Sequence, residues 1–279
     1  MARLRATGVA PLNRTTKRPI FPRPGFPWSR FPWPRFPWTT LGSLAVLIIL
    51  WQVSAVAAGS DLWPPPAAVL GRLSEEFASG ELTEHLSITL LRVATAFAIA
   101  MLVGTAFGML MGSKTAWNNV LDALLIIGLN IPALVTIVLC YLWLGLTEAA
   151  AVVAVALNKI PTVVVTVREG ARAVDQDLME VARAYRLSRL TTLRRVFAPQ
   201  LYPYLMAAAR SGLALIWKIV LVVELLGRSD GVGFQIGTFF QFFDITSILA
   251  YTLAFAAVVY VIEALVMQPI DRHIARWHR

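Results

Sequence analysis

The sequence predicts an all-α polytopic membrane protein with six transmembrane helices. Hydrophobic residues make up 57% of its 279 residues and charged residues only 15%, with a mean hydropathy of +0.66, beyond the apolar content of soluble domains. Its apolar runs are close to the ~20 residues that a helix needs to cross a hydrocarbon core. Helices are the expected form because they satisfy their own backbone hydrogen bonds in lipid.

The second, third and sixth predicted spans contain no charged residue at all. Lys159 lies within the fourth span, and Lys218 and Glu224 lie within the fifth. The six spans are residues 41–59, 93–113, 123–147, 148–167, 204–227 and 245–262.

Charge asymmetry predicts the orientation. Eight basic residues and no acidic ones precede the first span, whereas the next loop is acidic around residues 75–84. By the positive-inside rule, the amino-terminal tail is cytoplasmic, the acidic loop is outside and both chain ends are inside. The net charge of +9 is therefore a topology signal, and no nucleic-acid partner is expected.

The tails flank a single transmembrane domain, residues 41–270. Residues 1–40 repeat Phe-Pro-Trp three times among arginines, a composition that predicts a disordered tail lying on the anionic inner leaflet of the bilayer. A specific protein-binding motif is the alternative. Residues 271–279 form a second cytoplasmic tail. Between the first two spans, residues 67–80 predict a short interfacial helix.

The second span carries a packing signal. Small residues recur every fourth position and so form a ridge along one helix face, as in helices that approach closely in lipid. The partner helix belongs either to the same chain or to a second copy. The ridge consists of Ala96, Ala100, Gly104, Gly108 and Gly112.

Polar residues and prolines inside spans are candidates for the translocation path, because polar groups are costly in hydrocarbon. The two asparagines could instead satisfy their local backbone. Lys159 is expected to snorkel to the cytoplasmic interface. Lys218 could attract an anion or take part in a structural ion pair. The candidates are Asn130, Pro132, Asn158, Lys218 and Glu224.

Neither a catalytic site nor a cofactor is predicted. None of the four lysines follows a glycine as a P-loop requires, and the three histidines have no partners at metal-ligand spacing. No nucleophile–base arrangement stands out. An energy source is therefore expected on another polypeptide.

Residues 180–203 form an arginine-rich amphipathic segment within a cytoplasmic loop of about residues 169–203. A charged insert between two apolar spans predicts docking of a cytoplasmic partner. Glu180 is expected to open a helix, where the helix dipole favours a carboxylate. The docking residues are Glu180, Val181, Ala182, Arg183, Arg186, Arg189, Pro199 and Pro203.

Glu180-Val181-Ala182, followed by Pro199 and Pro203, is similar to the EAA loop of binding-protein-dependent ABC importer permeases. Val181 replaces the family's middle Ala, and Arg186 replaces a Gly at which the loop bends. Over residues 60–270 the chain resembles the nitrate, taurine and aliphatic-sulfonate class. The further motifs are Trp63-Pro64-Pro65-Pro66, Trp143-Leu144-Gly145-Leu146-Thr147-Glu148, Trp217, Glu224-Leu225-Leu226-Gly227 and Gly231-Val232-Gly233.

This resemblance implies a type I ABC importer permease fold in the bacterial inner membrane, with no cofactor of its own. It implies a second permease copy, two cytoplasmic ATPase subunits, an extracytoplasmic solute-binding protein and a small anionic solute such as nitrate, taurine or a sulfonate. A secondary transporter without an ATPase is the alternative, but neither a coupling-ion site nor internal repeats are evident.

Overall fold

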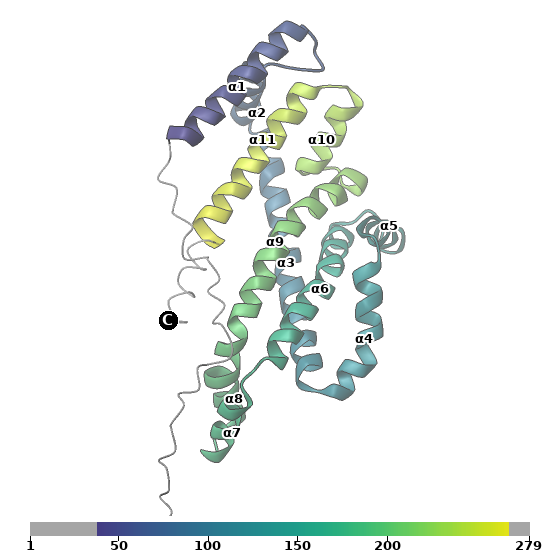
Figure 1. The fold of residues 1–279 in the computed structure, drawn as a ribbon. Helices are drawn as coiled ribbons and strands as arrows, with labels where there is room; N and C mark the ends of the chain where they lie inside the picture. Colours follow the sequence, from purple (N-terminus) through teal and green to yellow (C-terminus); the bar gives the residue numbers. More distant parts are fainter. Residues whose placement is uncertain (1–37, 268–279) are drawn as a thin grey trace, which may run out of the picture. The chain divides into compact units, whose positions relative to one another are not determined.

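The computed structural model describes residues 38–267, and this part of the chain contains helices and no β-strand. Contacts divide the chain into two units, Met1–Ile48 and Ile49–Arg279, and α1 (Trp38–Ala58) begins in the first and continues into the second. The other elements, all in the second unit (Figure 1), are α2 (Pro66–Ser79), α3 (Glu81–Ser113), α4 (Thr115–Asn130), α5 (Ala133–Leu144), α6 (Glu148–Arg172), α7 (Gln176–Ala184), α8 (Arg189–Thr192), η2 (Leu193–Phe197), α9 (Ala198–Gly227), α10 (Val232–Gln241), α11 (Ile245–Ile262) and η3 (Glu263–Met267).

Four helical segments among the described residues are long and apolar enough to cross a membrane, and a fifth is reached if α4 and α5 form one broken span. They correspond to the predicted spans after the first. The described apolar part of α1, Gly42–Ala58, is shorter than these segments. Six spans are therefore not established for this part of the chain.

The third predicted span, residues 123–147, is not one straight helix. α4 ends at Asn130, α5 begins at Ala133, and the two axes are bent by 100°. Pro132 explains the break, because it lacks a backbone N–H and disfavours a helical conformation at the residue before it. Ile131 is indeed extended, with φ −69° and ψ 124°.

The second unit is organised around α3, α6 and α9, which pack on one another (Figure 1). The small-residue ridge of α3 faces α6 of the same chain. A Cβ atom at Gly104 would lie 2.6 Å from the Cβ of Val163, and one at Gly108 would lie 2.7 Å from the Cβ of Val167. The two backbones can approach this closely only because the ridge lacks side chains.

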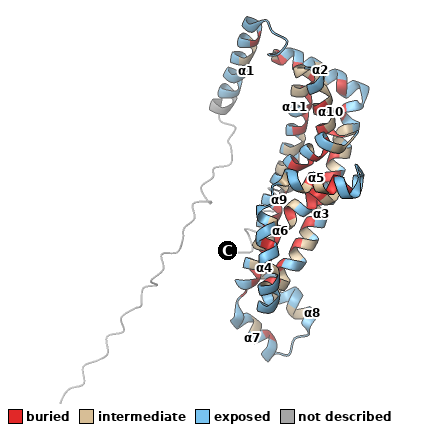
Figure 2. Cartoon of the chain, turned by 90° about the vertical axis from the view of Figure 1, so that its right-hand side faces the viewer, coloured by how far each residue is buried: buried red, intermediate tan, exposed pale blue. Residues whose placement is uncertain are grey.

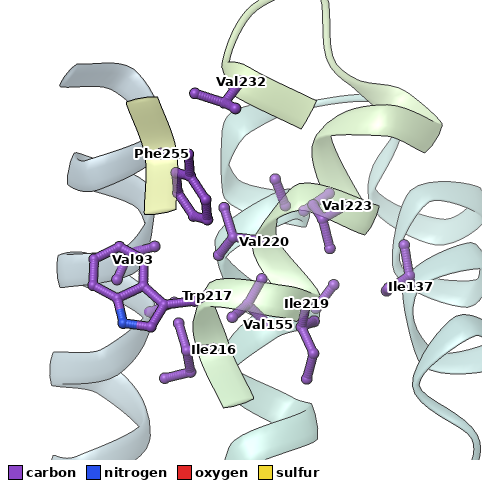
Figure 3. Packing of buried hydrophobic residues seen from close by; sticks show 14 of the residues in the cluster. Val93, Ile137, Val155, Ile216, Trp217, Ile219, Val220, Val223, Val232 and Phe255 are labelled. Atoms are coloured by element: carbon purple, nitrogen blue, oxygen red, sulfur yellow. The ribbon is translucent and has the colours of Figure 1, made fainter. Parts of the chain in front are cut away.

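Bulky side chains fill the space where α9 meets α11. The rings of Trp217 and Phe255 pack edge to face with centroids 5.7 Å apart (Figure 3). Ile216, Val220 and Val223 extend the same buried cluster along α9. This apolar packing holds the C-terminal half of α9 against α11.

The short helix predicted at residues 67–80 is α2, which packs on α11. Arg72 donates to Ser247, and Tyr251 donates to the buried carboxylate of Glu76. Burial lowers the pKa of Arg72, but a hydrogen bond to Glu75 and the charges of Glu76 and Asp244 outweigh it and raise the pKa overall.

Candidate functional site

α7 begins one turn earlier than the position of Glu180 suggested. Asp175 is its N-cap, and its side chain accepts hydrogen bonds from the backbone N–H groups of Asp177 and Leu178. Glu180 lies in the middle of α7, so the expectation that it opens the helix is wrong. Two other carboxylates, Asp175 and Asp177, occupy the dipole-favoured end.

α7 ends in a bend that places a non-glycine residue in the left-handed region. Arg186 has a φ of 51°, and its backbone N–H donates to the carbonyl of Arg183. The backbone N–H of Leu187 donates to the carbonyl of Ala182. These two bonds form a Schellman motif, in which glycine is the usual residue at the position of Arg186. The bend is retained at a backbone cost of about 1–2 kcal/mol.

α7 lies outside the candidate membrane-spanning helices, and most of its residues are exposed (Figure 2). Leu178, Val181 and Tyr185 are 48%, 52% and 79% exposed, and their spacing places them on one helix face. Glu180 is exposed beside them, whereas Ala182 is buried against the protein. An exposed apolar face with a neighbouring carboxylate is suited to contact with another protein.

Both predicted prolines lie on α9 just after the π-helical turn η2. Pro199 occupies the first turn, where a missing N–H is tolerated, and Pro203 lies inside the helix. Arg183 and Arg189 point to the opposite side of the segment and line a cavity beneath α3. The segment α7–η2 thus offers two different surfaces.

The translocation-path candidates do not come together. Asn130 and Asn158 each donate to the carbonyl four residues earlier, Ile126 at 2.7 Å and Ala154 at 2.9 Å, as expected for local backbone satisfaction. Pro132 forms the break between α4 and α5. Lys218 is exposed on α9, and no described residue forms an ion pair or hydrogen bond with it.

Lys159 does not snorkel to an interface. Its side chain is 1% exposed because it enters the space left by Gly212 on α9, where a Cβ atom would lie 2.7 Å from the lysine Cε. It follows the same four-residue stripe of α6 as Val163 and Val167, so it lies inside the α3–α6–α9 packing.

Glu224 belongs to a buried charge cluster centred on Arg92. The five N–H donors of Arg92 are all used. Glu148 accepts two of them at 2.6 and 2.7 Å, Glu224 accepts one at 2.8 Å, and Asp230 accepts through its backbone and its carboxylate. Arg92 is 2% and Glu224 0% exposed. This burial removes Glu224 from the set of residues that could line a path.

The glycines after Glu224 fit around its carboxylate. Gly233 and Thr89 donate to its Oε2 at 2.8 and 3.0 Å, and Val232 donates to the Thr89 hydroxyl. Gly231 has a φ of 102°, and a Cβ there would lie 2.6 Å from Oε2 of Glu224. The Gly231-Val232-Gly233 motif therefore packs closely around the Glu224 carboxylate, whose two oxygens both accept hydrogen bonds.

Arg228 completes the cluster by bonding to the Leu146 carbonyl and to Glu148. The sequence reasoning missed Arg92, Glu148, Arg228 and Asp230 as site residues. Arg92 and Glu148 each lie at the end of an apolar run, and this position next to a span was the one sequence feature that could have marked them. Their partnership leaves no local pattern, because Arg92 is 56 residues from Glu148 and 132 from Glu224.

The bundled apolar helices are those of a multi-pass membrane protein, from which an amphipathic segment projects. Residues 104–277 match the family of binding-protein-dependent transport system inner membrane components. The chain belongs to this family of inner-membrane permeases, and it is a transport component rather than an enzyme.

Relatives within the family carry names that refer to anionic or zwitterionic solutes. The nitrate import permease protein NrtB of Synechocystis sp. is 30% identical over 70% of this chain and 74% of its own. The taurine transport system permease protein TauC of Escherichia coli K12 is 27% identical over 86% and 89%. In fold, the chain resembles the MetNI methionine ABC transporter in an inward-facing conformation (TM-score 0.57, 20% identity, 67% of this chain and 93% of that one).

Proposed function

We propose that this chain is the permease subunit of an ATP-driven importer for a small solute with an anionic group, such as nitrate, taurine or another sulfonate. The relatives named for nitrate and taurine support this solute class. The fold supports the transporter class through its resemblance to the methionine ABC transporter. A solute-binding protein outside the membrane would deliver the solute.

The α7 end of the bundle is the cytoplasmic end in this proposal. Five arginines lie between residues 168 and 189 and two more in η2, whereas the opposite end carries the carboxylates of α2, of the first turn of α3 and of the charge cluster. The positive-inside rule therefore orients α7 toward the cytoplasm and α10 outward, with both chain ends inside.

A second copy of the chain would cover the exposed face of α9 that carries Lys218. Lys218 is exposed in mid-span, and a cation facing hydrocarbon costs at least about 2.5–3.5 kcal/mol. That cost is removed if α9 faces a water-filled path between two copies, where the ammonium attracts the anion. Exposed residues continue the same helix face at Ala207, Ser211, Ala214, Val222 and Leu225.

The ATPase would dock on α7, and the exposed face of Leu178, Val181 and Tyr185 is the observation that carries this assignment. Apolar side chains at this exposure are unfavourable in water unless a partner covers them. Pro199 lines the same hollow as these side chains, and Glu180 and Arg186 are exposed on the same segment. Movement of the ATPases would reach the bundle through η2 and α9, which continue without a loop.

Glu180→Arg tests this function by reversing an exposed charge on the docking helix α7. Like-charge juxtaposition at an interface can cost several kcal/mol. We expect the variant to insert normally but to lose most co-purifying ATPase and solute uptake. Glu84→Arg is the matched control, since Glu84 is an exposed carboxylate at the opposite end, and it should retain the ATPase. Retention of ATPase and uptake by Glu180→Arg would reject the assignment and favour a transporter without an ATPase.

A further inference from the structure

A cavity of about 710 Å³ lies between the end of α3 and the segment α7–η2. Its size is within the range of small-molecule sites. The α3 residues that line it, at positions 106, 109, 110 and 113, recur at helical spacing on the face opposite the small-residue ridge. α6 covers the ridge, and the cavity face of α3 is turned toward α7 and η2.

The walls of this cavity are amphipathic. Met109, Leu110 and Phe197 contribute an apolar floor, while Lys114, Arg183 and Arg189 contribute three cationic groups. No aspartate or glutamate is among the described residues that line it. None of the three cationic side chains forms an ion pair or a hydrogen bond with another described residue.

The cavity lies where a membrane-spanning helix ends. α3 runs without a charged residue from Val93 to Ser113, and Lys114 is the first residue beyond it. Lys114 therefore marks the depth at which hydrocarbon gives way to headgroups. An apolar floor on the membrane side and cations on the water side are arranged as the two parts of a phospholipid are.

We propose that this cavity binds one anionic phospholipid of the bilayer. Its phosphate contacts Lys114, Arg183 and Arg189, and part of an acyl chain lies on Met109, Leu110 and Phe197. Charge complementarity favours an anionic headgroup over a zwitterionic one, as in other basic pockets beside membrane helices. The apolar floor favours a lipid over a free anion, since a soluble phosphate would leave it in contact with water.

The bound lipid would join α3 to the segment that carries the docking face. The cavity is on the side of α7 that bears Arg183, whereas Leu178 and Tyr185 line a different hollow. The lipid and a protein partner can therefore bind the segment together. The proposal rests on the membrane location of the family and does not require that α7 contact an ATPase.

Native mass spectrometry of the detergent-purified full chain tests the proposal, with dioleoyl phosphatidylglycerol and dioleoyl phosphatidylcholine titrated separately. The wild type should bind phosphatidylglycerol more tightly. The double variant Lys114→Gln, Arg189→Gln should weaken that binding about 30-fold, because each cation near an anionic lipid is worth about fivefold. Arg194→Gln with Arg195→Gln is the matched control, since it removes two exposed cations next to the cavity, and it should change binding little.

Two further arms separate a lipid from a soluble anion. Ala106→Phe fills the apolar part of the cavity and leaves its charges, so it should reduce phosphatidylglycerol binding. Inorganic phosphate at millimolar concentration should not displace the lipid. Equal binding of the two lipids, equal loss in both double variants, or displacement by phosphate would each overturn the proposal.

Discussion

The two ends of the helix bundle are built on opposite principles. At the α10 end, two arginines and three carboxylates form ion pairs around the buried side chains of Arg92 and Glu224. On the segment α7–η2 at the other end, Arg183, Arg186 and Arg189 form no ion pair with a described residue. The same chain thus closes one end on itself and leaves the other end open for other molecules.

The comparison shows why charge alone does not identify a functional surface. The cluster around Arg92 has more charges in less space, but every donor of Arg92 is already used, so it has little left to offer a ligand. A buried cluster of this kind contributes specificity of packing among α3, α6, α9 and α10. The unpaired groups at the α7 end are the ones available for recognition.

The largest expected effect is at the closed end. Arg92→Met would leave Glu224 buried without its charge partner, which costs about 3–5 kcal/mol. We expect low membrane yield and a sharply lower unfolding temperature of the purified chain. Arg183→Met, at the open end, should change stability by no more than about 0.5 kcal/mol. Similar losses in the two variants would remove the distinction between the ends.

A smaller effect should follow from adding one methyl group beside the cluster. Gly231→Ala combines a positive φ with a Cβ 2.6 Å from a carboxylate oxygen of Glu224, so about 2–3 kcal/mol of stability should be lost. Gly80→Ala is the control, with a φ of 87° but open space around its Cβ, and it should cost about 1 kcal/mol. Thermal unfolding measures both. Equal losses of stability in the two variants would show that the Glu224 carboxylate can move away from the added methyl group and that the cluster is not tightly packed.

The smallest effect should have the opposite sign. Arg186→Gly relieves the left-handed conformation at the end of α7 and should stabilise the segment by up to about 1 kcal/mol. Limited proteolysis at residues 176–192 should slow down. Faster cleavage would mean that the Arg186 side chain holds the bend through contacts that outweigh its strain.

Helix positions were largely predictable from the sequence. Apolar length gave both ends of α11 and one end each of α6 and α9, because lipid burial imposes both length and composition. The same criterion failed for residues 123–147. Apolar length contains no information on the direction of the helix axis, so it could not predict the 100° bend at Pro132.

Side-chain partnerships were not predictable, because they join residues far apart in the chain. Glu224 was identified as a costly polar residue, but its partner Arg92 is 132 positions away. Lys159 was expected to reach water, and only the gap at Gly212 reveals why it stays inside. Asp175 was an available signal, since aspartate just before an amphipathic helix is a preferred N-cap.

Amide hydrogen exchange with and without the ATPase subunit tests the contrast between the two ends most directly. Docking at the open end predicts slower exchange at residues 176–192 on adding the ATPase. Residues 224–235, already bonded within the charge cluster, should exchange at the same rate in both states. Unchanged exchange at 176–192, or slowing at 224–235 in its place, would contradict the account.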